Sequence, residues 1–173
     1  MKYRLYIFVP YNISEIQKGI QAGHAALEYA YLHGGSFEYN EFIKNDKTWI
    51  ILNGGTTRNG NWETDLGLGS LNEIARELLE NKIRYSLFSE PDLNFALTAV
   101  CFLADERVWD FETYPDFEKS LWEESLASSL GYVRSRERLM EMFPEDYATW
   151  VKEIVGGKKN AFLRELIRNK KLA

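Results

Sequence analysis

The sequence predicts an α/β fold, in which a small mixed sheet packs against helices and a helical region follows. Over the first 104 residues, strand-like and helix-like segments alternate in the order β-α-β-α-β-β. From residue 105 onward the pattern becomes helical. The apolar content of 45% over 173 residues is enough to build a packed core. We therefore expect an α/β domain over residues 1–104 and a helical C-terminal extension over residues 105–173.

The first strand and the first helix have the clearest signals. Residues 3–11, YRLYIFVPY, form a largely apolar run that is typical of a strand buried on both faces. Ser14 and Gln17 have the spacing of a capping box, which predicts that a helix begins here. We expect this helix to run to about His33 and to end at the glycine pair 34–35.

Three further strands are predicted from short runs rich in β-branched or aromatic residues, at residues 48–53, 83–89 and 96–104. Pro91 marks a turn between the last two, which must be antiparallel if they are neighbours. A second capping-box pair, Ser70 and Glu73, predicts the start of a helix over residues 71–82. In the extension, four helical segments are predicted, at residues 117–131, 134–143, 144–155 and 160–171.

The long loop at residues 54–70 is rich in glycine, asparagine and threonine, and a loop of this length is usually functional or mobile. Trp62 could stack on a base there or pack down on the domain. The GLGS segment at residues 67–70 could hold a phosphate at a helix N-terminus, although a short glycine pair is a weak signal. The loop is therefore a candidate contact for RNA.

The charge is unevenly distributed along the chain. A net charge of −5 argues against a strongly basic nucleic-acid binder. Residues 105–124 contain eight acidic and two basic side chains, a net charge of −6, whereas residues 151–173 contain seven basic and two acidic ones, a net charge of +5. The basic segment fits either a solvated amphipathic helix or a contact for phosphate or an acidic surface.

Cys101 is the only cysteine, so no internal disulfide can form, which fits a reducing compartment. Two histidines and one cysteine make a zinc site with nitrogen and sulfur ligands improbable. The apolar run at the N-terminus stops at Pro10 and does not have the shape of a signal peptide, and no stretch is long enough to span a membrane. We expect a cytoplasmic protein without a metal, a cofactor or a membrane contact.

Helical periodicity separates two ridges on the first helix. The apolar ridge is expected to face the core: Ile16, Ile20, Gly23, Leu27 and Tyr31. The polar ridge lies beside it: Gln17, Gln21, His24 and Glu28. A glycine on the core-facing ridge costs about 1 kcal/mol relative to alanine, which suggests that another backbone approaches closely. His24 is then a border residue, which either bonds a carbonyl or glutamine locally or belongs to a site.

Gln21, His24 and Ala25 lie in the stretch IQAGHAALEYA, which resembles the first-helix motif of the type 2 peptidyl-tRNA hydrolases, roughly K-x-A-A-Q-x-x-H-A. The resemblance continues through the strands and the second helix and covers roughly residues 3–104. It implies a three-layer α/β/α fold with a four-stranded mixed sheet. It also implies cleavage, without a metal, of the ester that joins a peptide to the 3′ end of tRNA.

The family's implicated residues are carried over one by one. Its threonine at the start of the fourth strand corresponds to Thr98, and its acidic residue after the third strand falls near Glu90 or Asp92. Its lysine position is Gln17 here, next to Lys18, and its characteristic DAGRTQ segment is absent. The resemblance therefore implies a site that departs from the family at one helix position and in one loop.

Ester hydrolysis needs an activated water, a proton acceptor and donors for the developing oxyanion. His24 suits proton transfer near neutral pH, Glu90 or Asp92 could orient the water, Thr98 could donate a hydrogen bond, and Gln21 could position the ester. The expected contacts for tRNA phosphate are Lys18, Arg58, Lys158 and Lys159. The alternative is structural: Thr98 is then an ordinary strand residue and residues 90–92 an ordinary turn.

Three functional hypotheses follow. The first is a peptidyl-tRNA hydrolase-like enzyme, with tRNA or peptidyl-tRNA as its partner and the basic C-terminal segment helping to hold it. The second is a non-catalytic binding protein on the same fold, with the helical extension as the surface for an RNA or protein partner. The third is a hydrolase or transferase that acts on another RNA-linked or small-molecule substrate. Whether the chain is an enzyme, and whether it forms a homodimer, stay open at this stage.

Overall fold

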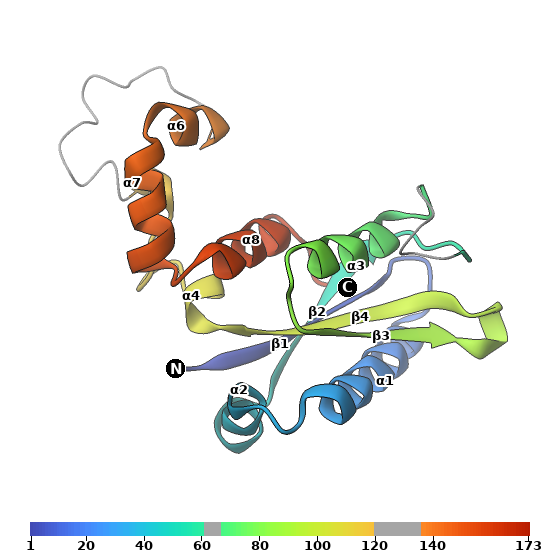
Figure 1. Cartoon of the computed structure of the whole chain (residues 1–173). Helices are drawn as coiled ribbons and strands as arrows, with labels where there is room; N and C mark the ends of the chain where they lie inside the picture. The colour runs from blue at the N-terminus through green and yellow to red at the C-terminus, as the bar shows by residue number, and fades with distance from the viewer. Residues whose placement is uncertain (61–66, 120–135) are drawn as a thin grey trace. The chain divides into compact units, whose positions relative to one another are not determined.

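A four-stranded mixed sheet organises the N-terminal part of the computed structural model, which describes residues 1–60, 67–119 and 136–173 (Figure 1). The strand order is β2-β1-β4-β3. β1 (Tyr3–Pro10) pairs in parallel with β2 (Thr48–Gly55) and antiparallel with β4 (Ala96–Asp105). β3 (Tyr85–Glu90) pairs antiparallel with β4, which confirms the predicted hairpin.

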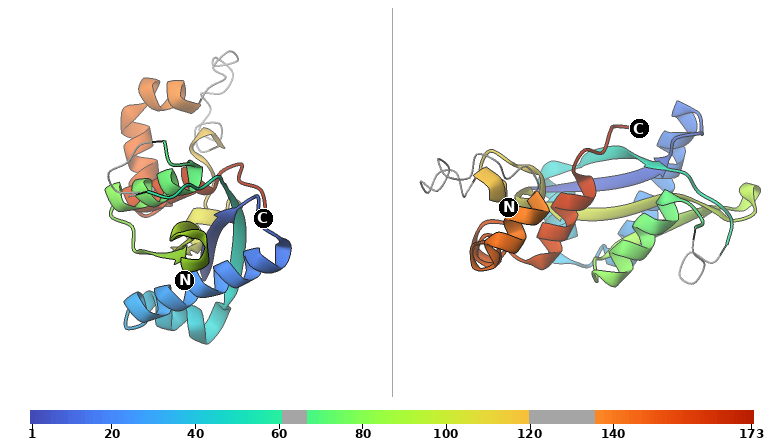
Figure 2. Two further views of the ribbon diagram at one scale, coloured as in Figure 1. Left: turned by 90° about the vertical axis from the view of Figure 1, so that its right-hand side faces the viewer. Right: turned by 90° about the horizontal axis from the view of Figure 1, so that it is seen from above.

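Helices cover both faces of this sheet, as the predicted fold class requires. α1 (Glu15–His33) lies on one face and α3 (Ser70–Glu80) on the other, as Figures 1 and 2 show. Because strand side chains alternate between faces, β1 contributes to two cores. Leu5, Ile7 and Val9 pack in the cluster under α1, whereas Tyr6 and Phe8 stack on Phe102 on the opposite face, with ring centroids 5.6 and 6.1 Å apart.

The predicted start of α1 is confirmed by its capping box. The backbone nitrogen of Gln17 donates to the Ser14 hydroxyl at 3.2 Å, and the backbone nitrogen of Ser14 donates to the Gln17 side-chain oxygen at 3.1 Å. These two bonds satisfy donors that the first helical turn leaves unpaired. Gly34 ends the helix, as predicted.

The predicted core-facing ridge of α1 is wrong. The buried residues of this helix are Gln21, Ala22, Ala25, Ala26 and Tyr29. The large side chains of the predicted ridge are exposed: Ile16, Ile20, Leu27 and Tyr31. Both sides of the helix are apolar, so periodicity alone does not choose between them. The side with alanines faces the sheet because small side chains let the helix pack closely.

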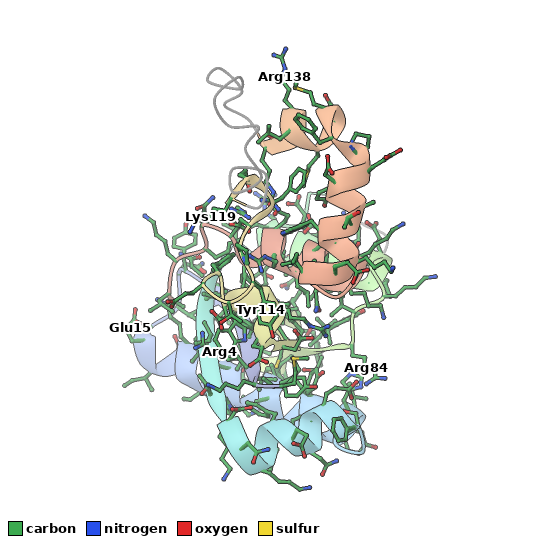
Figure 3. The ribbon with its side chains drawn as sticks, turned by 90° about the vertical axis from the view of Figure 1, so that its left-hand side faces the viewer. Arg4, Glu15, Arg84, Tyr114, Lys119 and Arg138 are labelled. Atoms are coloured by element: carbon green, nitrogen blue, oxygen red, sulfur yellow. The ribbon has the colours of Figure 1, made fainter. Side chains whose placement is uncertain are left out.

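The segment after α1 contains the predicted short helical piece. α2 (Phe37–Glu41) continues into a π-helical turn, η1 (Phe42–Asp46), which buries Phe42 under the sheet. Asp46 accepts a 2.8 Å hydrogen bond from the backbone nitrogen of Tyr3, which ties the turn to β1. Arg84, labelled in Figure 3, forms an ion pair of 3.2 Å with Glu38 of α2.

The predicted capping box of the second helix does not form. Ser70 is already the first residue of α3, and Gly69 occupies the cap position without a side-chain hydrogen bond. The Ser70 hydroxyl instead donates to the Gly54 carbonyl at 2.9 Å and accepts from the Thr56 backbone nitrogen at 3.0 Å. Contacts with the end of β2 therefore replace the local cap. Much of the loop before α3, including Trp62, lies outside the described residues.

The described residues divide into two units, which we call the sheet unit, Met1–Asp105 with Ile167–Ala173, and the helical unit, Glu106–Leu166. The end of the chain thus belongs with the sheet, whereas the sequence analysis assigned all of residues 105–173 to the extension. Lys171 accepts a 2.9 Å backbone bond from Asn53, and Ala173 donates a 3.0 Å bond to Ile51. These bonds pair the last residues with β2.

The described helices from Glu106 onward are α4 (Glu106–Trp109), α6 (Arg136–Met142), α7 (Pro144–Thr149), the π-helical turn η3 (Trp150–Ile154) and α8 (Lys158–Ile167), whose last residue is counted with the sheet unit. Most of the helix predicted over residues 117–131 lies outside the described part of the chain. Arg164, part of the basic segment, is fully buried and bonds Asp116 at 2.9 Å. Its guanidinium lies 4.4 Å from the centre of the Phe111 ring. This residue holds the unit together and is not a surface cation.

Gly23 gives a direct test of this packing. No atom lies within 4 Å of the position that a Cβ would take, so nothing opposes a methyl group there. We expect Gly23→Ala to raise the free energy of unfolding by about 0.5–1 kcal/mol, because alanine loses less backbone entropy in a helix. Urea denaturation of dilute protein measures the change.

Gly69→Ala is the matched control for that experiment. Gly69 has a φ of 130°, and a Cβ there would lie 2.5 Å from the Thr56 carbonyl oxygen. This variant should therefore lose more than about 1 kcal/mol of stability. A stabilised Gly69→Ala, or a destabilised Gly23→Ala, would contradict the packing described here.

Candidate functional site

Gln21 of α1 and Thr98 of β4 meet beneath the helix, although they are 77 positions apart. Both are buried. The Thr98 hydroxyl donates to the Gln21 side-chain oxygen at 2.6 Å, and the Phe88 carbonyl lies 3.3 Å from the same hydroxyl as a second acceptor. A buried amide needs such partners, because leaving one of its polar atoms unpaired would cost free energy.

Glu90, at the end of β3, completes this chain of hydrogen bonds. The Gln21 amide nitrogen donates to the Glu90 carboxylate at 2.6 Å. Since an amide nitrogen can only donate and a carboxylate can only accept, the direction of the chain is fixed as Thr98 to Gln21 to Glu90. A hydrogen bond to a charged acceptor is stronger than one between neutral groups. The chain therefore holds the Glu90 carboxylate at a defined place.

These three residues line a pocket of about 270 Å³ in the sheet unit. The lining residues are Ile13, Gln17, Ile20, Gln21, Glu90, Asp92, Leu93 and Thr98. Its walls are apolar at three positions, and its charged groups are two carboxylates, with no lysine or arginine in the lining. The volume lies just below the usual range for small-molecule sites, so the pocket fits one small group of a larger substrate.

The predicted site residues are thus partly brought together. Gln21, Glu90 and Thr98 share the pocket, and the alternative acidic residue Asp92 also lines it. His24 is not among the lining residues. Its ring is exposed and stacks on Phe88, with centroids 4.3 Å apart and planes 12° from parallel.

None of the predicted phosphate contacts is among the residues that line this pocket. The Lys18 ammonium pairs with Glu15 at 2.8 Å, and its side chain is only 13% exposed (Glu15 is labelled in Figure 3). Arg58 is exposed in the loop after β2, where its backbone nitrogen donates to Asn72 at 3.4 Å. Lys158 and Lys159 are exposed at the start of α8. The carboxylates of Glu90 and Asp92 have no lysine or arginine beside them in the pocket lining.

The apolar walls of the pocket were not predicted from the sequence. Ile13 precedes the α1 cap and Leu93 lies in the 3₁₀ turn η2 (Pro91–Leu93), so neither stands in a strand or helix pattern. Ile20 was assigned to the core face. The available signal in the turn was Leu93, an apolar side chain directly after Asp92.

The single thiol is not a candidate nucleophile. Cys101 is buried in the core under α1, and this burial raises the pKa of its thiol far above the ordinary value, while a hydrogen bond to Ser86 opposes the shift in part. Because the thiolate is the reactive form, the native thiol is inert near neutral pH.

Among residues 1–60, 67–119 and 136–173, no group of three or more histidine, cysteine, aspartate or glutamate side chains is placed to hold a metal ion. Within the same ranges, no helix has both the length and the apolar character needed to cross a bilayer. The pocket beneath α1 is therefore the candidate functional site.

Comparison of the chain with protein-family models finds no matching family, and comparison with curated proteins finds no match either. The family suggested by the first-helix motif receives no support from these comparisons.

The chain of hydrogen bonds predicts energetic coupling between Thr98 and Gln21. Thr98→Val keeps the side-chain shape but removes the donor, which leaves the Gln21 oxygen buried without a partner and should cost about 1–3 kcal/mol. In a cycle of Thr98→Val, Gln21→Leu and the double variant, the double should lose about 0.5–3 kcal/mol less than the two single losses added together. Urea denaturation measures all four proteins, and additive losses would mean that the bond contributes no stability.

The buried thiol predicts a second, simpler result. Cys101 should not react with a disulfide reagent in the native protein near pH 8, and it should react at once in denaturant, because unfolding restores its ordinary pKa and its access to solvent. Absorbance of the released thiol follows the reaction. Rapid modification of the folded protein would show that the β4 core opens readily.

Proposed function

We propose that the sheet unit is an ester hydrolase of the peptidyl-tRNA hydrolase type, which cleaves the ester between a peptide and the 3′ end of tRNA without a metal. The main support is the convergence of Gln21, Glu90 and Thr98. The family resemblance matches Gln21 in the first-helix motif and Thr98 in the fourth strand, and it puts the acidic residue near Glu90 or Asp92. Three separate elements bring Gln21, Glu90 and Thr98 to one pocket.

In this proposal Glu90 is the general base. One of its carboxylate oxygens is held by Gln21, so the other can take a proton from water as that water attacks the ester carbonyl. The bond to the ribose oxygen then breaks, and the proton passes to that oxygen. The products are a free peptide carboxyl group and a tRNA with a free 3′ hydroxyl.

Gln21 and Thr98 act as positioning residues for Glu90. Thr98 fixes the amide of Gln21, and Gln21 fixes the carboxylate, so neither needs to exchange a proton during the reaction. A base held in place in this way loses little orientation when the substrate binds. The three apolar walls of the pocket fit the hydrocarbon part of the residue that carries the ester.

The proposal keeps His24 outside the chemical step. Its side chain does not line the pocket, and its ring already stacks on Phe88. His24 therefore takes no part in the proton transfer. Substitution of His24 should thus affect the rate much less than substitution of Glu90.

Release of peptide from an N-blocked aminoacyl-tRNA tests the proposal. Glu90→Gln retains an acceptor for Gln21 but cannot take a proton, so kcat should fall by about 100-fold or more. His24→Ala should leave kcat within about threefold, since it removes no proton acceptor from the pocket. Glu28→Gln, an exposed change on the same helix, is the matched control and should behave as the unmodified protein does.

Two outcomes would end the proposal. One is folded protein that releases no more peptide than buffer does. The other is a Glu90→Gln variant that is as active as the unmodified protein, because the base would then lie elsewhere.

One observation favours a second candidate, a non-catalytic RNA-binding or protein-binding module. The family's lysine position holds Gln17, which is engaged in the capping box, and the neighbouring Lys18 pairs with Glu15. A pocket with two carboxylates and no cation offers little to a developing oxyanion. This module would bind its partner without releasing peptide.

Binding of tRNA as a function of salt identifies the kind of partner. If phosphate contacts dominate, affinity should fall by orders of magnitude between about 50 and 200 mM salt. Lys158→Gln combined with Lys159→Gln should then reduce the slope of log affinity against log salt, whereas Lys44→Gln, an exposed change on η1, should not. Absence of tRNA binding at low salt would leave a protein partner as the remaining form of this candidate.

A further inference from the structure

α1 presents a second apolar face, which points away from the sheet. Its large side chains are well exposed: Ile16 by 78%, Ile20 by 50%, Leu27 by 70% and Tyr31 by 85%. They recur at helical spacing and so form one stripe along the helix, which we call the outer stripe. Scattered exposed apolar residues are ordinary on a protein surface, but a continuous stripe of this kind marks an interface.

The outer stripe is free of charge. The other residues within its arc are Gly19, Gly23, His24 and Ala30, and the nearest carboxylates, Glu15 and Glu28, lie at its two edges. A surface helix normally carries its charged residues on the side away from the core. In Figures 1 and 2, no other described element of the sheet unit covers this side of α1. The composition of α1 is therefore that of a helix with a packing partner on both sides.

The glycines of the stripe indicate how close a partner comes. Neither Gly19 nor Gly23 has any atom within 4 Å of the position of an added Cβ. Two interior glycines cost this helix about 1 kcal/mol each relative to alanine, and no contact within the described chain compensates for them. A partner backbone that packs closely against the helix at these glycines would offset this cost. The distance between two packed helices is set by the side chains at the crossing point, so glycines allow the closest approach.

The area of the stripe matches a weak symmetric interface. If each large side chain presents roughly 150–200 Å² when fully exposed, the exposed fractions of the four together correspond to roughly 400–550 Å². Two such stripes would bury roughly 800–1,100 Å² before the polar rim is counted, and specific interfaces begin at about 1,000–1,200 Å². A second copy of the chain thus supplies enough surface for reversible association.

We propose that the outer stripe of α1 is the interface of a homodimer in which the two α1 helices run antiparallel. A two-fold axis between Gly23 and His24 places Ile16 of one copy opposite Tyr31 of the other, and Ile20 opposite Leu27. Gly23 of each copy then lies opposite His24 of the other at the crossing point, and large apolar side chains flank this pair on both sides. The stripe is self-complementary in this register, as an isologous interface requires.

Charge selects the antiparallel arrangement over the parallel one. In the register above, Glu28 lies opposite Gly19 and Glu15 lies opposite Leu32, so no carboxylate faces another. A parallel pair would place Glu15 against Glu15 and Glu28 against Glu28, and such like-charge contacts weaken association. The uncharged stripe also gives no electrostatic preference for a partner of a different kind.

The dimer does not depend on the proposed hydrolase activity, but it adjoins the same pocket. Ile20 belongs to the outer stripe and also lines the pocket of Gln21 and Glu90. In the dimer, Leu27 of the second copy lies against Ile20 and so extends the apolar wall of that pocket. The surface for self-association and the pocket proposed for substrate are therefore adjacent on α1.

Sedimentation of the full chain tests the dimer. Between about 1 μM and about 300 μM, the mass should change from that of a monomer to that of a dimer, as expected for an interface at the small end of the range. Leu27→Glu should stay monomeric throughout. Leu79→Glu places the same charge on an exposed apolar position of α3 and should associate as the unmodified chain does.

Gly23→Ala distinguishes a specific dimer from non-specific hydrophobic association. A methyl group at the crossing point should weaken self-association by about tenfold or more through overpacking, even though it stabilises the isolated helix. Circular dichroism checks that each variant is folded, and Ile16→Gln replaces Leu27→Glu if that variant does not fold. A chain that stays monomeric at every concentration would overturn the proposal, and so would a folded Leu27→Glu or Ile16→Gln variant that still forms the dimer.

Discussion

The close contact between α1 and the sheet is the constraint on which the other features depend. Ala22, Ala25 and Ala26 face the strands, and their small side chains let the helix backbone lie near β1 and β4. Dispersion and the exclusion of water favour the closest packing that the side chains allow. The choice of the alanine side as the inner side then fixes where every other residue of the helix points.

Two consequences follow from that orientation. Gln21, next to the alanines, becomes buried, and a buried amide is stable only with partners, which Thr98 and Glu90 supply from the β3–β4 hairpin. The large apolar residues, from Ile16 to Tyr31, are turned toward solvent, where water does not stabilise them. The orientation of α1 on the sheet thus determines both the candidate site on its inner side and the candidate interface on its outer side.

Sequence reasoning succeeded where the determining contacts are local. The Ser14–Gln17 capping box and the β3–β4 hairpin involve residues close in sequence, and both form. It failed for the inner face of α1, because apolar residues recur with helical period on both sides and the close approach of the alanine side decides between them. It also failed at Ser70, whose hydroxyl bonds Gly54 and Thr56 across the loop. The motif around Gln21 indicated a site, but its hydrogen bonds required the tertiary fold.

Two tyrosines on α1 distinguish the orientation described here from the alternative. Tyr29 is 3% exposed beneath the helix, whereas Tyr31, two residues later, is 85% exposed on the outer stripe. Hydroxyl-radical footprinting of dilute native protein, read by mass spectrometry, reports the exposure of each ring separately. We predict strong oxidation of Tyr31 and protection of Tyr29. Oxidation of Tyr29 with protection of Tyr31 would mean that α1 packs on its other face, and both the site and the interface would then have to be abandoned.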